Sequence, residues 1–214
     1  AGGHLYNFIN TFLHQHACIA GSGGLRPGSP ATLKKPALLL VTGKWWPAAA
    51  RLALALVQQG CRVDVLCPTG HPLLQVPGLG RCWHFAMRDS LGSLRAVLGP
   101  GHDYRLILPC DDEVVAQLIT LHEQVPVLRH LIEQSIGPAQ AHATLLQRHQ
   151  LLVTAQSLGL DVPEHRPLDS PQDLLFWFRE GHGRSVLKRD LSFGGAGVRI
   201  VNDQAEAEEA CRAF

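Results

Sequence analysis

The chain has 214 residues, of which 46% are apolar and 17% are charged, a balance typical of a globular protein rather than a disordered one. Its formal net charge of +1 gives no basic surface of the kind that binds nucleic acid. No apolar run reaches the roughly 18 residues that a membrane-spanning helix needs. Composition therefore predicts no nucleic-acid or membrane partner, and the length allows one large domain or two small ones.

The six cysteines have neither the spacing of a metal site nor that of a redox pair. No two of them form a Cys-x-x-Cys motif, and no set of cysteines and histidines has zinc-site spacing. With no secretory signal evident, they predict reduced thiols in a cytoplasmic protein. They are Cys18, Cys61, Cys67, Cys82, Cys110 and Cys211.

The first 35 residues predict an amphipathic helix and a linker outside the main fold. Between residues 4 and 20, apolar side chains recur with helical spacing and form one stripe. Residues 21–35 have no periodicity, which is typical of a flexible linker. The polar face has hardly any lysine or arginine, so the pattern favours an arm for packing or homo-oligomer formation over a membrane-surface anchor. The stripe consists of Leu5, Phe8, Ile9, Phe12 and Leu13.

Residues 36–130 alternate between strand and helix patterns. Strands are expected over 37–43, 62–68 and 104–110, and helices over 47–59 and 111–124. The strand–helix–strand connection is long enough for a crossover, which favours a small open parallel sheet. Ligands bind at the carboxyl ends of the strands in such sheets. We therefore expect substrate-facing residues in the two loops there, namely Thr42, Gly43, Lys44, Trp45, Asp111 and Asp112.

Residues 131–214 predict helices followed by a β-hairpin. One or two helices are expected over 137–159, another over 171–180 and a last one over 203–214. Strands over 185–190 and 198–202 flank the segment "LSFGGAG". Glycine between two strands is a common turn signal, but a glycine-rich turn also exposes backbone N–H groups that can bind phosphate. Lys188 would add a positive charge beside such a site, and both interpretations stay open on these residues alone.

Other motifs are absent or ambiguous. "VTGKWW" lacks the upstream glycine and the hydroxyl residue of a P-loop, no Gly-x-Gly-x-x-Gly opens the first helix, and no Gly-x-Ser-x-Gly elbow occurs. The acids of "CDDE" could bind magnesium, although acids at a helix start more commonly cap it and interact with its dipole. The pair Trp45–Trp46 could line a ligand site or simply pack.

The order and spacing of these features resemble the ATP-grasp ligases, including the carbamoyl-phosphate-synthase-like and D-alanine–D-alanine-ligase-like members. In that family an α/β domain precedes a helix with a basic residue eleven positions before the glycine of a Gly-x-x-Val-Pro segment. Here Arg148 stands eleven residues before Gly159 in "GLDVPEH". The family's second lysine lies on a strand before a glycine loop ending in Gly-Val, and Lys188 with "SFGGAGV" matches it. The resemblance spans residues 36–214.

The resemblance implies an α/β fold, with a preparatory domain over 36–130 and the first part of an α+β ATP-grasp domain over 131–214. It implies a ligase that couples a small carboxylate to an amine or a thiol, using ATP and Mg²⁺ to form an acyl phosphate. Arg148 would contact the α- or β-phosphate, Lys188 would bridge phosphate and the adenine side, and a lid would close over both, with Phe193 excluding water. The lid residues are Ser192, Phe193, Gly194, Gly195, Ala196 and Gly197.

Two departures from the family pattern affect the expected activity. Arginine stands at the first basic position, where lysine is common. The family's Mg²⁺ ligands belong beyond the final helix, so no metal ligand is expected in residues 1–214, which alone are expected to be an inactive N-terminal fragment. Two alternatives stay open: a non-catalytic nucleotide- or partner-binding protein on the same scaffold, and the nucleotide-sugar-binding half of a glycosyltransferase.

Overall fold

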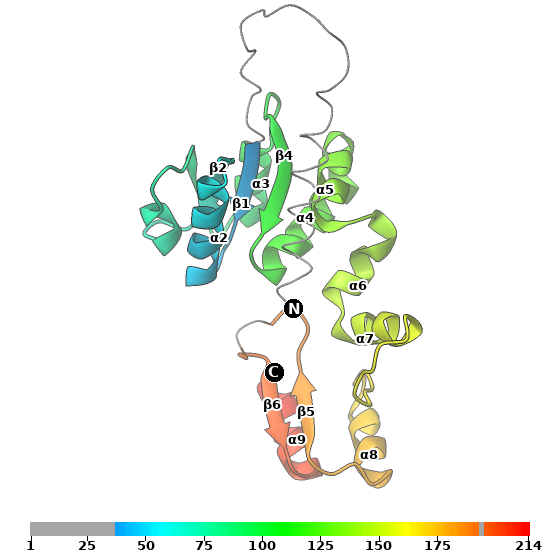
Figure 1. Ribbon diagram of the computed structural model, residues 1–214. Helices are drawn as coiled ribbons and strands as arrows, with labels where there is room; N and C mark the ends of the chain where they lie inside the picture. The colour runs from blue at the N-terminus through cyan, green and yellow to red at the C-terminus, as the bar shows by residue number, and fades with distance from the viewer. Residues whose placement is uncertain (1–36, 193–194) are drawn as a thin grey trace, which may run out of the picture. The chain divides into compact units, whose positions relative to one another are not determined.

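A computed structural model of the chain describes residues 37–192 and 195–214 (Figure 1). The helix and linker predicted over 1–35 lie outside these residues, as do Phe193 and Gly194 of the predicted lid. Within the described ranges, no helix combines the length and the apolar character needed to cross a lipid bilayer.

The first part of the fold is built on a four-stranded, entirely parallel sheet with the strand order β3–β2–β1–β4. The strands are β1 (Ala37–Val41), β2 (Arg62–Cys67), β3 (Cys82–His84) and β4 (Tyr104–Pro109). All five residues of β1 are buried, which explains why this strand is a continuous apolar run rather than an alternating one. The prediction of a small open parallel sheet is confirmed, and the carboxyl ends of its strands meet at one edge.

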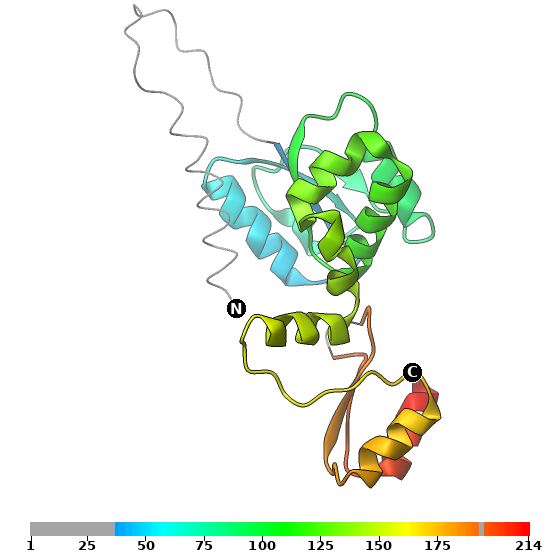
Figure 2. The same cartoon turned by 90° about the vertical axis from the view of Figure 1, so that its right-hand side faces the viewer.

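Helices cover both faces of this sheet, with α2 on one face and α3, α4 and α5 on the other (Figure 1, Figure 2). The helices are α2 (Pro47–Gln58), α3 (Ser90–Val97), α4 (Asp112–Gln124) and α5 (Arg129–Ile136), with 3₁₀ turns at Pro72–Gln75 and Pro126–Leu128. In the main core, Leu39 and Val41 of β1 pack with Leu118 and Leu121 of α4 and with Ile132 of α5. This apolar packing fixes the loops at the carboxyl edge of the sheet.

The second part of the fold consists of helices and a two-stranded antiparallel hairpin. Its elements are a 3₁₀ turn (Ala139–Ala141), α6 (His142–Leu146), α7 (Arg148–Ser157), α8 (Pro171–Arg179), β5 (Ser185–Lys188), β6 (Val198–Val201) and α9 (Gln204–Ala213). Ser170 and Asp173 form a reciprocal capping box at the start of α8, where the sequence predicts a helix. The predicted helical region 137–159 is divided into the 3₁₀ turn, α6 and α7.

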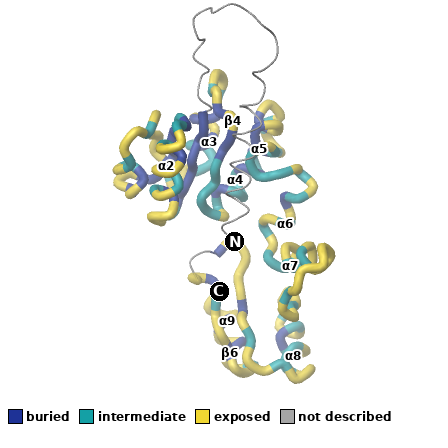
Figure 3. The backbone as a smooth tube through the Cα atoms, viewed as in Figure 1, coloured by how far each residue is buried: buried dark blue, intermediate teal, exposed yellow. Residues whose placement is uncertain are grey.

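The β5–β6 hairpin has one covered face and one exposed face. Leu187 and Val201 pack against Leu174 of α8 and against Ala207 and Ala210 of α9. The strand register pairs Val186 with Ile200 and Lys188 with Val198, and these four residues form the opposite face, which we call the open hairpin face. The side chains of Val186 and Ile200 are 52% and 57% exposed there. Figure 3 shows the contrast between the buried parallel sheet and the largely exposed hairpin.

Candidate functional site

Two loops meet at the carboxyl edge of the parallel sheet, and Asp111 joins them. Its Oδ2 accepts hydrogen bonds from the backbone N–H of Gly43 at 2.8 Å and from the hydroxyl of Thr42 at 3.0 Å. Its Oδ1 accepts from the N–H of Val114 at 3.0 Å and caps α4. The structure therefore brings together the loops after β1 and β4, which the sequence predicted at one site.

His71, which the sequence pattern did not single out, holds the loop after β1 in place. Its Nδ1 accepts a hydrogen bond from the backbone N–H of Leu73, and its Nε2 lies 2.9 Å from the carbonyl oxygen of Lys44. Because an amide N–H can only donate, this network places the ring proton on Nε2, which donates to Lys44. The His71 ring also lies 5.6 Å from the ring of Trp45. Since His71 is fully buried and Trp45 is 58% exposed, the tryptophan is supported on one side and open to solvent on the other.

The three consecutive acids at the start of α4 have three different partners. Asp111 binds the loop after β1, Asp112 lies 4.0 Å from the guanidinium of Arg148, and Glu113 pairs with Lys44 at 2.8 Å. Carboxylates that bind separate partners do not converge on one ion. Among the described residues, no group of three or more His, Cys, Asp or Glu side chains is placed to hold a metal. In the structure, the "CDDE" acids cap a helix and form ion pairs.

Lys188 lies at the end of β5 on the open hairpin face, next to the glycine-rich loop. It is exposed, and no carboxylate of the described residues pairs with it. Gly195 has a φ of +81°, in the left-handed region that favours glycine. A Cβ on Gly197 would lie 2.1 Å from Oγ of Ser192, so a side chain does not fit there. Glycine is therefore favoured at position 195 by the backbone conformation and at position 197 by the close approach of Ser192.

Arg148, at the first residue of α7, binds the base of this loop. Its Nε donates to the carbonyl oxygen of Arg189 at 3.1 Å, and its Nη2 donates to the carbonyl oxygen of Ser192. Its backbone N–H donates to Asp190 at 2.9 Å, so an acid lies at the positive end of α7. Ser192 is only 4% exposed, and its hydroxyl donates to Arg189. A phosphate at Arg148 would have to use Nη1 or replace these bonds.

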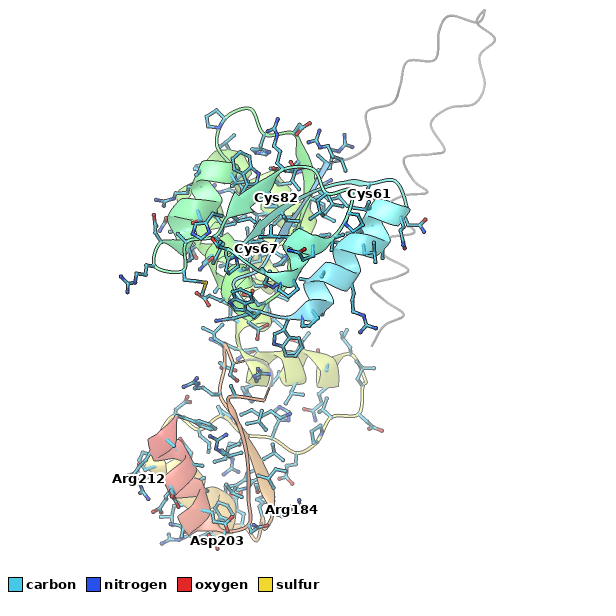
Figure 4. All side chains as sticks on the ribbon, turned by 90° about the vertical axis from the view of Figure 1, so that its left-hand side faces the viewer. Cys61, Cys67, Cys82, Arg184, Asp203 and Arg212 are labelled. Atoms are coloured by element: carbon cyan, nitrogen blue, oxygen red, sulfur yellow. The ribbon has the colours of Figure 1, made fainter. Side chains whose placement is uncertain are left out.

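Cys67 and Cys110 do not provide a nucleophile at neutral pH. Figure 4 shows Cys61, Cys67 and Cys82 in the first part of the fold, where none forms a disulfide. Burial, with a smaller effect of Cys82, raises the pKa of Cys67 to about 11. Burial likewise raises the pKa of Cys110, next to Asp111, to about 12. Both side chains are therefore thiols at neutral pH, and thiols are poor nucleophiles and metal ligands.

No family model and no curated protein matches the chain. Among solved structures, it resembles N5-carboxyaminoimidazole ribonucleotide synthetase from Thermus thermophilus, with a TM-score of 0.55 and 23% identity over 82% of this chain and 43% of that one. It also resembles carboxyaminoimidazole ribonucleotide synthase from Aspergillus clavatus complexed with ATP, with a TM-score of 0.62 and 16% identity over 84% of this chain and 44% of that one.

A third similar structure is the biotin carboxylase domain of 2-oxoglutarate carboxylase from Hydrogenobacter thermophilus, a dimer in complex with MgADP, ADP and bicarbonate. Its TM-score is 0.53, with 17% identity over 83% of this chain and 39% of that one. The chain thus spans less than half the length of the structures it resembles. At these identities the likeness concerns the fold, and it agrees with the resemblance seen in the sequence. The described part of the chain has the fold of the N-terminal portion of the ATP-grasp ligases.

Proposed function

We propose that the chain is the nucleotide-binding, N-terminal part of an ATP-dependent carboxylate–amine (or thiol) ligase that forms an acyl phosphate. The observation that carries this proposal is Lys188, which is exposed beside a loop that favours glycine at positions 195 and 197. A cation without a carboxylate partner in the described residues, next to such a loop, suits a phosphate group. The likeness to structures that contain ATP or ADP supports the choice of nucleotide.

The open hairpin face has the chemistry that a nucleotide needs. Val186 and Ile200 lie opposite each other and offer exposed apolar surface for the flat base, while Lys188 offers its charge to a phosphate. The contacts of Arg148 indicate that it positions the loop base through Arg189 and Ser192, with Nη1 left for a phosphate oxygen. When bound, ATP would supply the phosphoryl group that activates the carboxylate. We assign no Mg²⁺ ligand to the described residues.

Calorimetric titration with ATP tests this proposal. The chain, a Lys188→Ala variant and an Arg212→Ala variant should be compared. Arg212 is an exposed cation in the last turn of α9, labelled in Figure 4, and it serves as the matched control. Loss of a charge-assisted phosphate contact should weaken ATP binding about tenfold or more in Lys188→Ala, with no change in Arg212→Ala.

The outcomes of this titration separate the alternatives. Equal or negligible binding of ATP by all three proteins would contradict the proposed nucleotide site. Tighter binding of UDP-glucose than of ATP would instead favour the glycosyltransferase alternative. A non-catalytic binding protein would bind ATP, but the complete gene product would form no hydroxamate when hydroxylamine is added as a trap for an acyl phosphate.

A further inference from the structure

Three backbone N–H groups in the loop after β1 donate hydrogen bonds within the protein. The backbone N–H of Gly43 donates to Asp111, that of Lys44 donates to the Thr42 hydroxyl at 3.1 Å, and that of Trp46 donates to the carbonyl oxygen of Lys44 at 2.8 Å. The Lys44 ammonium pairs with Glu113. A phosphate at the end of a strand needs such N–H groups and such a charge. Here these three N–H groups and the ammonium are engaged, and the carboxylate of Asp111 accepts from both Thr42 and Gly43.

The same loop exposes large apolar side chains. Trp45 is 58% exposed, Trp46 is 48% exposed, and Met87 from the β3–α3 turn is 47% exposed. Met87 lies over the loop, because its sulfur is 3.5 Å from the position of a Cβ on Gly43. The ring of Trp45 packs against the buried ring of His71. Exposed aromatic groups that are held in position, at the carboxyl edge of a parallel sheet, are typical of ligand contact rather than of core packing.

We infer that this surface, the aromatic edge formed by Trp45, Trp46 and Met87, binds the uncharged apolar or aromatic part of a carboxylate substrate and excludes a phosphate-bearing one. The inference rests on the proposed function, since it names the substrate class of that ligase.

One cation in these turns lacks a carboxylate partner among the described residues. Arg88 follows Met87 and is exposed. An exposed arginine on a turn offers a solvated charge, without the converging backbone N–H groups that make a phosphate site. Arg88→Ala is therefore included in the test. If this variant loses phosphate binding that the unchanged chain shows, Arg88 is the phosphate-binding residue.

Indole N–H signals in NMR spectra of ¹⁵N-labelled chain provide the test. The four tryptophans give four signals, and Trp83 and Trp177, which donate hydrogen bonds to Tyr104 and Ser185, serve as internal controls. The two probes are 3-phenylpropionate and 3-phosphoglycerate, both carboxylates, one aromatic and one phosphorylated. We expect saturable shifts of the Trp45 and Trp46 signals with 3-phenylpropionate and none with 3-phosphoglycerate.

Substitution of Trp45 tests its role in ligand binding. Trp45→Ala should weaken binding of 3-phenylpropionate about tenfold, whereas Trp45→Phe should retain most of it, because a smaller ring still stacks. Saturable shifts of Trp45 with 3-phosphoglycerate that disappear in Arg88→Ala would overturn the inference. The absence of saturable shifts when 3-phenylpropionate is added up to roughly 10 mM would also overturn it. ATP binding is measured separately through Lys188→Ala, so failure of this inference is distinguishable from failure of the proposed function.

Discussion

The guanidinium of Arg148 donates a hydrogen bond to the carbonyl oxygen of Ser192, 44 residues away in the sequence. With its second bond to the carbonyl oxygen of Arg189, it holds both ends of the turn that leads into the glycine-rich loop. Leu191 within this turn has a φ of +53°, a conformation that non-glycine residues rarely adopt. The contacts of Arg148 therefore stabilise a turn that is locally unfavourable.

Replacing Arg148 with alanine should open this turn. Loss of the charge-assisted bonds at a partly exposed site should raise the rate of tryptic cleavage after Arg189 by about tenfold. Arg148→Lys should be intermediate, because an ammonium cannot reproduce the planar fork. Mass spectrometry of timed digests measures the cleavage.

The matched control for that experiment is Arg129→Ala. Arg129 is an exposed arginine whose Nε, like that of Arg148, donates to a carbonyl oxygen, here that of His122 at 3.0 Å. Its replacement should leave cleavage after Arg189 unchanged. Equal rates for the chain, Arg148→Ala and Arg129→Ala would show that Arg148 does not hold the loop.

Asp111 and Asp112 are adjacent carboxylates with different expected contributions to stability. Asp111→Ala removes the cap of α4 and leaves the N–H of Gly43 without its acceptor, which should lower the free energy of unfolding by about 2–3 kcal/mol. Asp112→Ala removes a 4.0 Å ion pair at the surface and one acid from the first turn of α4, and should cost less than about 1 kcal/mol. Urea unfolding followed by circular dichroism measures both, and similar losses for the two variants would contradict the network around Asp111.

Tyr104 should make the folded chain less stable at high pH. Burial, helped by the hydrogen bond that its hydroxyl donates to Asp64 at 2.9 Å, raises the pKa of Tyr104 from 10.0 to about 12. The unfolded chain therefore loses this proton first, and the stabilisation present below pH 10 should be lost as the pH rises from about 10 to 12, by up to ~1.4 kcal/mol per pH unit.

Tyr104→Phe cannot ionise, so its unfolding free energy should fall less steeply over this range in urea titrations at several pH values. The unfolding free energy of both proteins should still fall at high pH because of Cys67 and Cys110. Their pKa values rise from 9.0 to about 11 and about 12. Identical slopes for the two proteins would contradict the raised pKa of Tyr104.

The sequence predicted the elements whose burial leaves a strong pattern. β1 is covered on both faces, so its continuous apolar run is readily detected. β2 was predicted from the alternation in "RVDV", although five of its six residues are buried. β3 escaped prediction because Cys82, Trp83 and His84 are all exposed at the sheet edge and follow no alternation. α3 and α5, which are eight residues each, were also not predicted.

The site was only partly predictable for a different reason. The loops after β1 and β4 could be placed together, because parallel strands align their carboxyl ends. The contacts of His71 and Arg148 could not, since their partners are the backbone carbonyl oxygens of Lys44, Arg189 and Ser192. A carbonyl oxygen is present at every residue, so it leaves no signal in the sequence.

The most direct test of the central claim is to map where ATP binds along the chain. Backbone amide shifts should be recorded as ATP is added to ¹⁵N-labelled protein. If the open hairpin face binds the nucleotide, Lys188, Val198 and Ile200 should show the largest saturable shifts, and these shifts should disappear in Lys188→Ala. Shifts that are absent from β5 and β6, or that persist unchanged in Lys188→Ala, would contradict a nucleotide site on this face.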